Sequence, residues 1–367
     1  MSLLEQLQTR GGQCLPLLLL AATETANIDG ISAAGSTAQS RRQTAAADAE
    51  LLRYGPATRR PHALPPLPAG VSPALIGHVV LRELGMLQRL KVVDLGCLIA
   101  PAVEHLRLPH PAGAGPAHCL GSGRALHPAR VEALITLGQR WGEHLHPAQP
   151  LLLAECVPGG TSTALAVLLG LGIEADGLVS GSLRHSAHAL KSQLARQGLA
   201  AAGLAPNLGD ADQARAVLAA VGDPMQPLAA ALCLAAAHQR VPVVLAGGSQ
   251  MAAVLALALA LAPAPLRPCV AANTLLATTA WVMDEADSQL GLLLERIGAR
   301  WDVPLQWRAS QLRFQSCRSQ ALRDYERGYV KEGVGAGGLA VLWELLGRSP
   351  GALALACDQA CDVLLGF

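Results

Sequence analysis

Aromatic side chains are scarce in this sequence: Phe, Tyr and Trp together make up 3% of its 367 residues. The core therefore cannot be built around large rings. Hydrophobic residues nevertheless reach 51%, most of them Ala, Leu and Val, which excludes a disordered chain. Small aliphatic side chains fill a core when helices and strands pack closely, so the composition favours a layered α/β fold.

An excess of charge of either sign is also missing. The chain has 28 basic and 27 acidic residues, with a formal net charge of +1. Nucleic-acid-binding domains carry a basic stripe, and a pair such as Arg59-Arg60 is too short to make one. We therefore expect no nucleic-acid partner.

Hydrophobic runs long enough to cross a membrane are absent from the sequence. The apolar run 252–262 has roughly half of the ~20 residues that a spanning helix needs, and Pro263 ends it. The run 15–22 lacks the layout of a signal peptide, because Glu24 and Asp29 follow it directly. We expect a soluble, cytoplasmic protein without a membrane partner.

The nine cysteines form no CxxC pair and are odd in number. This is typical of a reducing compartment, where most of them act as small buried hydrophobic residues. The histidine pairs His144-x-His146 and His185-x-x-His188 have no third ligand at a suitable spacing. We expect no metal site, and no feature of the sequence requires a cofactor.

Short apolar runs that end in glycine-rich turns recur along the chain, and a helical stretch follows each one. This alternation predicts βαβ units and a three-layer, Rossmann-like parallel sheet with a smaller helical domain. We expect residues 15–283 to form the Rossmann-like domain, and 1–14 with 284–367 to form mainly the smaller lobe. Proline-rich loops are expected at 54–70 and 108–118. The predicted strands are 15–21, 90–95, 151–154, 177–180, 241–246, 268–272 and 302–305; the predicted helices are 128–143, 162–171, 187–202, 211–221, 228–238, 251–261, 284–298 and 339–346.

The first motif with chemical content is LLLAECVPGGTSTA, residues 151–164. A strand ends at Glu155, the turn Gly159-Gly160 follows, and Thr161 opens a helix. In a parallel sheet this places a carboxylate and a helix N-terminus at the edge where ligands bind. No Lys follows the glycines, which excludes a P-loop. A plain strand-to-helix turn with a Thr or Ser cap is the alternative.

The second motif is KEGVGAGGL, residues 331–339. Glu332 precedes a loop containing Gly333 and Gly335, and a helix follows. A carboxylate beside a flexible loop can approach a ligand closely, and partial burial would raise its pKa toward that of a general base. The alternative is a Glu that merely complements the helix dipole.

Three further segments complete the candidate site. VPVVLAGGSQMA, residues 241–252, repeats the strand, double glycine and helix with Gly247 and Gly248. Lys191 follows the loop that begins at Gly181, where it is either a phosphate counter-charge or a solvated surface Lys. In ATETANIDGISAAG, residues 22–35, polar side chains follow the first strand and either line the same cleft or form a surface loop, the reading we favour; they are Glu24, Asn27 and Asp29.

In this order, the motifs resemble nicotinate-nucleotide:dimethylbenzimidazole phosphoribosyltransferase, as a divergent branch. KEGVGAGG is similar to the family's EGTGA motif, and ECVPGGTST to EMGIGNTT. VPVVLAGGSQMAA resembles VLDGFISTAAA, and ATETANIDGISAAG resembles AADHGVADEGVSAYP. The chain departs from these patterns at Val157, Gly160 and Ala246, where the family has Gly, Asn and Asp. These departures bear on the substrate more than on the fold.

The resemblance implies a homodimeric enzyme that moves the ribose phosphate of nicotinate mononucleotide onto a benzimidazole or purine-like base, for the lower ligand of a cobamide. Glu332 would be the general base and Glu155 a second site carboxylate. Lys191 would bind the nucleotide phosphate, and the remaining ligand-binding positions are Gly159, Gly160, Thr161, Gly181, Gly247, Gly248, Gly333 and Gly335. The alternative is a nucleotide-binding or regulatory protein without transfer activity. A kinase or NTPase is disfavoured by the missing P-loop Lys.

Overall fold

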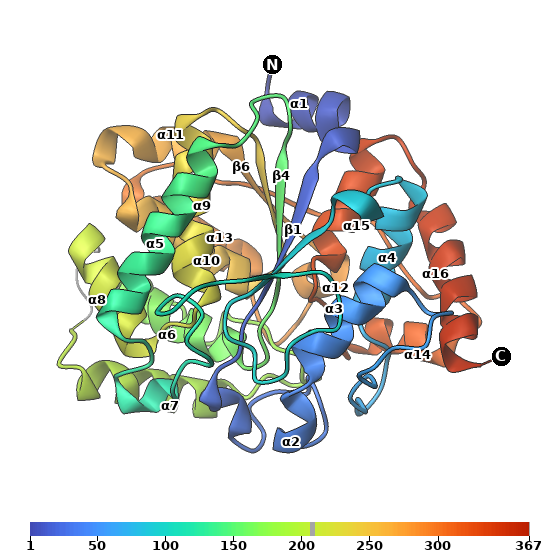
Figure 1. Cartoon of the computed structure of the whole chain (residues 1–367), viewed down its shortest axis with the longest axis horizontal. Coiled ribbons are helices and arrows are strands. Elements are labelled where there is room, and N and C mark those ends of the chain that lie inside the picture. The colour runs from blue at the N-terminus through green and yellow to red at the C-terminus, as the bar shows by residue number, and fades with distance from the viewer. Residues whose placement is uncertain (206–209, 367) are drawn as a thin grey trace.

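A computed structural model describes residues 1–205 and 210–366, and within them seven strands form one parallel sheet. The sheet order is β3-β2-β1-β4-β5-β6-β7 (Figure 1). The predicted three-layer, Rossmann-like α/β fold is confirmed. The strands are β1 Leu15–Leu20, β2 Lys91–Asp94, β3 Leu106–Arg107, β4 Leu151–Cys156, β5 Val243–Ala246, β6 Thr274–Thr278 and β7 Gln306–Ala309.

The strand order contains one reversal, between β1 and β4. The chain first builds outward from β1 to β3 and then returns to place β4 on the other side of β1, with Leu15 opposite Leu151. In open α/β sheets, ligands bind outside the carboxyl ends of the strands at such a switch point. The ends of β1 and β4 are therefore where a site is expected.

Each strand of the sheet interior buries both of its faces. Along β1, Leu17 and Leu19 pack into one hydrophobic cluster, whereas Leu18 and Leu20 pack into the other. This explains why the strands read as continuous apolar runs without alternation.

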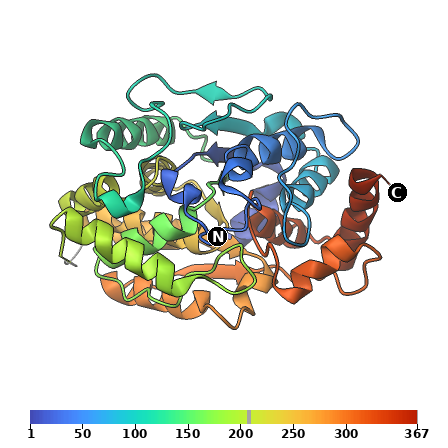
Figure 2. The ribbon, with the colours of Figure 1, turned by 90° about the horizontal axis from the view of Figure 1, so that it is seen from below.

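Helices cover both faces of the sheet, and the two layers lie on opposite sides in Figure 1. The N-terminal and C-terminal helices contribute to the same hydrophobic cluster, and Figure 2 shows the C-terminal helix at the right-hand edge of the molecule. None of the described helices is both long and apolar enough to span a membrane. The first layer contains α5 Pro128–Glu143, α6 Gly160–Gly170, α7 His188–Ala201, α8 Ala211–Val221, α9 Met225–His238, α10 Ser249–Leu261, α11 Arg267–Asn273 and α13 Leu290–Trp301. The second contains α1 Leu3–Arg10, α3 Thr44–Tyr54, α4 Ala74–Glu83, α14 Gln320–Arg323, α15 Ala336–Leu345 and α16 Pro350–Leu365; α2 Ala38–Arg41 and α12 Ala280–Met283 are short connecting turns.

The helix starts follow recognisable sequence signals. Ser2 and Glu5 form a capping box on α1, and the His127 side chain accepts from Ala129 N before Pro128 opens α5. The boundaries of α5 and α8 match the predicted ranges, and most other predicted helices agree within three residues. The proline-rich loops are confirmed, since 55–70 and 108–118 contain no helix or strand.

Four predicted elements are wrong or displaced. Residues 268–272 form part of α11 instead of a strand, because Pro268 stands in the first turn of a helix, where its missing N–H costs nothing. Residues 177–180 form no strand, since Ser180 N donates to Ser249 Oγ and not to a sheet neighbour. The strand predicted at 302–305 lies at 306–309, because Asp302 takes the left-handed conformation that ends α13. The helix predicted from 284 begins only at Leu290.

The segment after 284 contributes to both layers. β7 pairs with β6, α13 joins the first layer, and α15 and α16 pack with α3 and α4 in the second. The division into a Rossmann-like domain and a smaller lobe stays a prediction.

Three of the few aromatic residues pack together beside the C-terminal segment. The Trp281 ring lies 5.0 Å from that of Phe314 and 4.8 Å from that of Tyr325. The Tyr325 hydroxyl donates to the Val71 carbonyl oxygen at 2.8 Å. This bond fixes the end of the first proline-rich loop against the C-terminal segment.

Candidate active site

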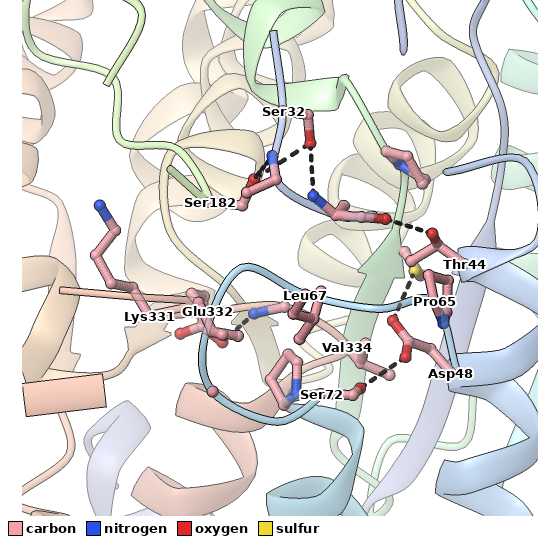
Figure 3. Close-up of a pocket in the computed structure, with 18 of the residues that line it drawn as sticks. Ser32, Thr44, Asp48, Pro65, Leu67, Ser72, Ser182, Lys331, Glu332 and Val334 are labelled. Atoms are coloured by element: carbon pink, nitrogen blue, oxygen red, sulfur yellow. Dashed lines mark hydrogen bonds between the residues drawn. The ribbon is translucent and has the colours of Figure 1, made fainter. Parts of the chain in front are cut away.

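A pocket of about 480 Å³ opens at the carboxyl edge of the sheet. The end of β4, the loops after β5 and near residue 181, and the loop before α15 form its walls (Figure 3). The first proline-rich loop and the residues just after it supply a further wall within 63–73, and the segment 32–34 and helix α3 add to the lining. Most of the segments that the sequence singled out thus meet in one place.

Glu155 is the residue before the last of β4, and its side chain is buried in the pocket wall. Val157 N donates to its carboxyl at 3.0 Å. The Glu155 pKa is raised to about 8. Burial is the main cause and the nearby Glu332 adds to the rise, whereas the Val157 N–H opposes it. Glu155 is therefore mainly protonated at neutral pH.

Glu332 lines the same pocket but receives many more hydrogen bonds. Thr278 Oγ1 and Thr279 N donate to Oε2 at 3.0 and 2.9 Å, and Gly333 N and Gly337 N each donate to Oε1 at 3.0 Å. Burial raises the Glu332 pKa, and these four donors oppose it. Four donors match the lone pairs of one carboxylate, so they stabilise the ionised form.

The glycines after Glu332 permit this close arrangement. A Cβ at Gly337 would lie 2.2 Å from the Thr278 carbonyl carbon and 2.3 Å from Glu332 Oε2. Gly335 adopts a φ of 77° before α15 and does not line the pocket. The loop is therefore glycine-rich because the backbone packs directly on the carboxylate and on β6.

The two glycine turns also meet at the pocket. Gly159, Gly160, Thr161 and Gly248 line it, whereas Gly247 lies behind, where its N–H donates to Ala277 O. Gly159 has a φ of 83° and stands directly before α6, whose first residues line the pocket. Gln250 also lines the pocket, and its Oε1 has no hydrogen-bond partner among the described residues.

Lys191 lies behind the pocket wall and not in it. Its side chain is buried, and Nζ donates to Ser180 O at 3.1 Å, directly behind Gly181. The Lys191 pKa is lowered to about 8, mainly by burial. The nearby Glu285 opposes this shift, and Lys331 adds to it. The Lys191 ammonium therefore supports the pocket loop from behind.

Lys331 reaches this loop from the opposite side, and the sequence motifs did not single it out. Its Nζ forms an ion pair with the buried Glu285 and donates to Leu183 O at 2.9 Å. Lys331 has a φ of 61°, and Thr279 Oγ1 donates to its carbonyl oxygen at 2.6 Å. The place of Lys331 directly before Glu332, at the start of the motif KEGVGAGGL, was the one feature of the sequence that could have indicated its role.

A further carboxyl group in the pocket wall comes from α3. Ser72 Oγ donates to Asp48 Oδ1 at 2.6 Å, and the Cys156 thiol donates to Oδ2 at 3.5 Å. Burial raises the Asp48 pKa to about 6, while the Ser72 and Cys156 bonds lower it. No motif pointed to Asp48, because it lies within an Ala-rich helix.

The segment after β1 reaches the pocket through small residues. Ser32, Ala33 and Ala34 line it, and Ser182 Oγ accepts from Ala33 N at 2.8 Å (Figure 3). Glu24, Asn27 and Asp29 are exposed and lie outside this pocket, which agrees with the surface-loop reading for these three residues, whereas Ser32 is a polar residue of 22–35 that lines the cleft.

Comparison with known proteins agrees with the motifs. A family model described as phosphoribosyltransferase matches residues 80–280. The UPF0284 protein of Parasynechococcus marenigrum is 52% identical over 354 residues, covering 95% of this chain and 87% of that protein. The UPF0284 proteins of Prochlorococcus marinus (strain MIT 9313) and Gloeobacter violaceus are 48% and 44% identical, covering 95% and 94% of this chain and 86% of each protein.

Two crystal structures from Thermus thermophilus share the fold. One is of nicotinate-nucleotide-dimethylbenzimidazole phosphoribosyltransferase and the other is of CobT; each aligns with a TM-score of 0.53 at 18% identity. Each alignment covers 99% of this chain, with 89% and 90% of the two neighbours. Because the family model spans more than half of the chain, and a UPF0284 protein is 52% identical to nearly all of it, the chain belongs to the phosphoribosyltransferase family and groups there with the UPF0284 proteins.

Proposed function

We propose that this protein transfers the phosphoribosyl group of nicotinate mononucleotide onto a ring nitrogen of a benzimidazole or purine-like base. One observation carries the proposal most directly: Glu155, mainly protonated, and Glu332, held by four donors, share the wall of a pocket at the switch point of the sheet. The family and the activity named for one structural neighbour support the same reaction.

The transfer requires one bond to form and one to break at the anomeric carbon. A lone pair on the acceptor nitrogen attacks this carbon, and the bond to the pyridinium nitrogen breaks with its electron pair, which releases nicotinate. The acceptor would become cationic unless its second ring nitrogen loses a proton. Glu332 accepts this proton and later returns it to solvent. Protons and electrons therefore balance in the reaction without a metal or redox group.

The pocket offers suitable partners for the ribose phosphate. Thr161 stands in the first turn of α6 and Ser249 opens α10, so the N-terminal turns of both helices lie at the pocket. The unpartnered Gln250 Oε1 can accept from a ribose hydroxyl. Lys191 and Lys331 each donate from Nζ to a backbone oxygen of the 181 loop, and their positive charges favour an anion near it.

Glu332 and the alignment of the two substrates contribute separately to the rate. A positioned general base accounts for about 10²–10⁴-fold, and the alignment of two bound reactants for at least as much. Removal of Glu332 should therefore lower the rate strongly without abolishing substrate binding.

Nicotinate release from nicotinate mononucleotide tests the proposal. We expect release that depends on dimethylbenzimidazole or adenine, and a fall of at least about 100-fold in kcat for Glu332→Gln. Glu344→Gln is the matched control, since this half-buried carboxyl on α15 lies outside the pocket. Nucleotide binding without release for any acceptor would instead support a non-catalytic nucleotide-binding protein, a reading that the four donors on Glu332 also allow.

A further inference from the structure

The pocket wall away from Glu332 contains the third carboxyl group, that of Asp48. In Figure 3, Glu332 and Lys331 lie on one side of Leu67, and Asp48 and Thr44 lie on the other. Asp48 comes from α3 and Glu332 from the loop before α15, so separate elements position the two groups. The pocket therefore has an acidic group at each side of the space that a ring would occupy.

Asp48 has few hydrogen-bond partners for a buried carboxylate. An ionised carboxylate offers about four acceptor positions. The four donors on Glu332 fill them, whereas Asp48 receives only the Ser72 hydroxyl and the weakly donating Cys156 thiol. Within residues 1–205 and 210–366, no Lys, Arg or His forms an ion pair with it. Asp48 can therefore accept further N–H or O–H groups from a ligand.

A donor without a partner lines the same pocket. Arg60 Nε is buried, and no group in the described part of the chain accepts from it. The remaining guanidinium contacts are with backbone oxygens, including Gly55 O at 2.6 Å. The wall formed by the proline-rich loop thus contains a buried donor that a ligand can reach after a shift of the Arg60 side chain, in addition to the unused acceptor capacity of Asp48 on α3.

The transfer reaction sets the orientation of the acceptor. The ring edge that loses a proton must face Glu332, so the opposite edge faces away from it, across the pocket. Dimethylbenzimidazole has methyl groups on that edge, and methyl groups cannot donate to a carboxylate. An amino-substituted nitrogen heterocycle has an N–H donor and a ring-nitrogen acceptor there, which complement Asp48 and Arg60.

We propose that Asp48 is a specificity-determining residue that accepts a hydrogen bond from the far edge of the acceptor, and that the preferred acceptor is an amino-substituted, purine-like base and not an alkylated benzimidazole. The proposal rests on the proposed function, because that reaction defines the orientation of the ring. It is supported by the burial of Asp48, its two modest donors and the unpartnered Arg60 Nε.

Acceptor competition in the full-length protein tests the proposal. For the wild type we expect kcat/KM for adenine to exceed that for dimethylbenzimidazole, and also for purine without the amino group, by at least about tenfold. Asp48→Asn should lower the value for adenine by at least about tenfold and leave that for dimethylbenzimidazole unchanged or higher. Asp94→Asn is the matched control: this buried carboxyl at the end of β2 accepts from Gly96 N and Cys97 N outside the pocket and should not change the preference.

Calorimetric binding of the same three bases to the wild type and to Asp48→Asn gives a second measurement, which needs no turnover. Tighter binding of adenine that depends on Asp48, without nicotinate release, would refute the proposed transfer and support the role of Asp48. Release with dimethylbenzimidazole at least as efficient as with adenine, or an equal effect of Asp48→Asn on both bases, would overturn the specificity proposal and leave the transfer intact. If Asp48→Asn does not fold, equal affinity of the wild type for adenine and purine overturns it alone.

Discussion

The substitution Glu155→Gln should change how the stability of the protein depends on pH. The Glu155 pKa is raised by burial from 4.5 to about 8 in the folded protein. Between these values the folded state holds a proton that the unfolded state has released, so the free energy of unfolding falls as pH rises. The stabilising contribution of Glu155 is complete below about pH 4.5 and is lost as pH passes through the folded pKa. The slope is about 1.4 kcal/mol per pH unit well below the folded pKa and halves at that pKa, so the loss between pH 6 and 8 is about 2 kcal/mol.

Glutamine has nearly the shape of protonated Glu and keeps an oxygen for Val157 N, so the variant should lack this slope. Urea unfolding at intervals from pH 6 to 8, for both proteins, measures the difference. Asp48, Asp223 and Lys191, whose folded pKa values lie at about 6, about 6 and about 8, are present in both proteins, so the difference between the two slopes reports Glu155. A wild-type slope that persists in Glu155→Gln would refute the assignment of this proton.

Two further substitutions test the loop that contains Glu332. Gly337→Ala should destabilise the protein by about 3 kcal/mol or more in urea unfolding, because the new Cβ meets the Thr278 backbone at 2.2 Å. Gly12→Ala, with nothing within 4 Å of the new Cβ, should change stability by less than about 0.5 kcal/mol, and equal losses would contradict the packing argument. Lys331→Met should cost about 3 kcal/mol in the same assay, since the buried Glu285 carboxylate loses its ion pair and keeps the hydroxyl donors of Ser180 and Ser288. Adding Glu285→Gln should recover most of this loss, and no recovery would contradict the ion-pair explanation.

The sheet was predictable because its strands are buried on both faces. β1 and β4 appear in the sequence as uninterrupted apolar runs with a polar residue or glycine turn at their ends. The same criterion failed at 268–272, where an apolar run after a proline became a helix, and at 177–180, where the run was too short to distinguish strand from turn. Periodicity identifies burial but does not specify the kind of element for short runs.

The candidate site was predictable only where one motif contained both a strand end and its turn. Glu155 and Glu332 each stand beside glycines, and the topology brings both to the pocket. Asp48 and Lys331 could not be found in this way. Asp48 reaches the pocket through the packing of α3, and the role of Lys331 depends on Glu285, which lies 46 residues away in the chain. Such contacts depend on how the layers pack, and no local pattern specifies that.

The unequal hydrogen bonding of Glu155 and Glu332 has a chemical consequence. Two carboxyl groups in one buried pocket cannot both ionise without repulsion. Glu332 has four donors that stabilise its anion, whereas Glu155 has the Val157 N–H and the Gln250 side chain, so the proton that they compete for resides on Glu155. In the proposed transfer, Glu332 must be ionised when the acceptor arrives, and its four donors favour that form, whereas burial raises its pKa and opposes it. The same four donors would limit its basicity, so proton transfer would require that the acceptor N–H replace one of them. A loop built from glycines can release a backbone N–H without moving a side chain, which would give the glycine-rich sequence after Glu332 a role in this reaction as well as in packing.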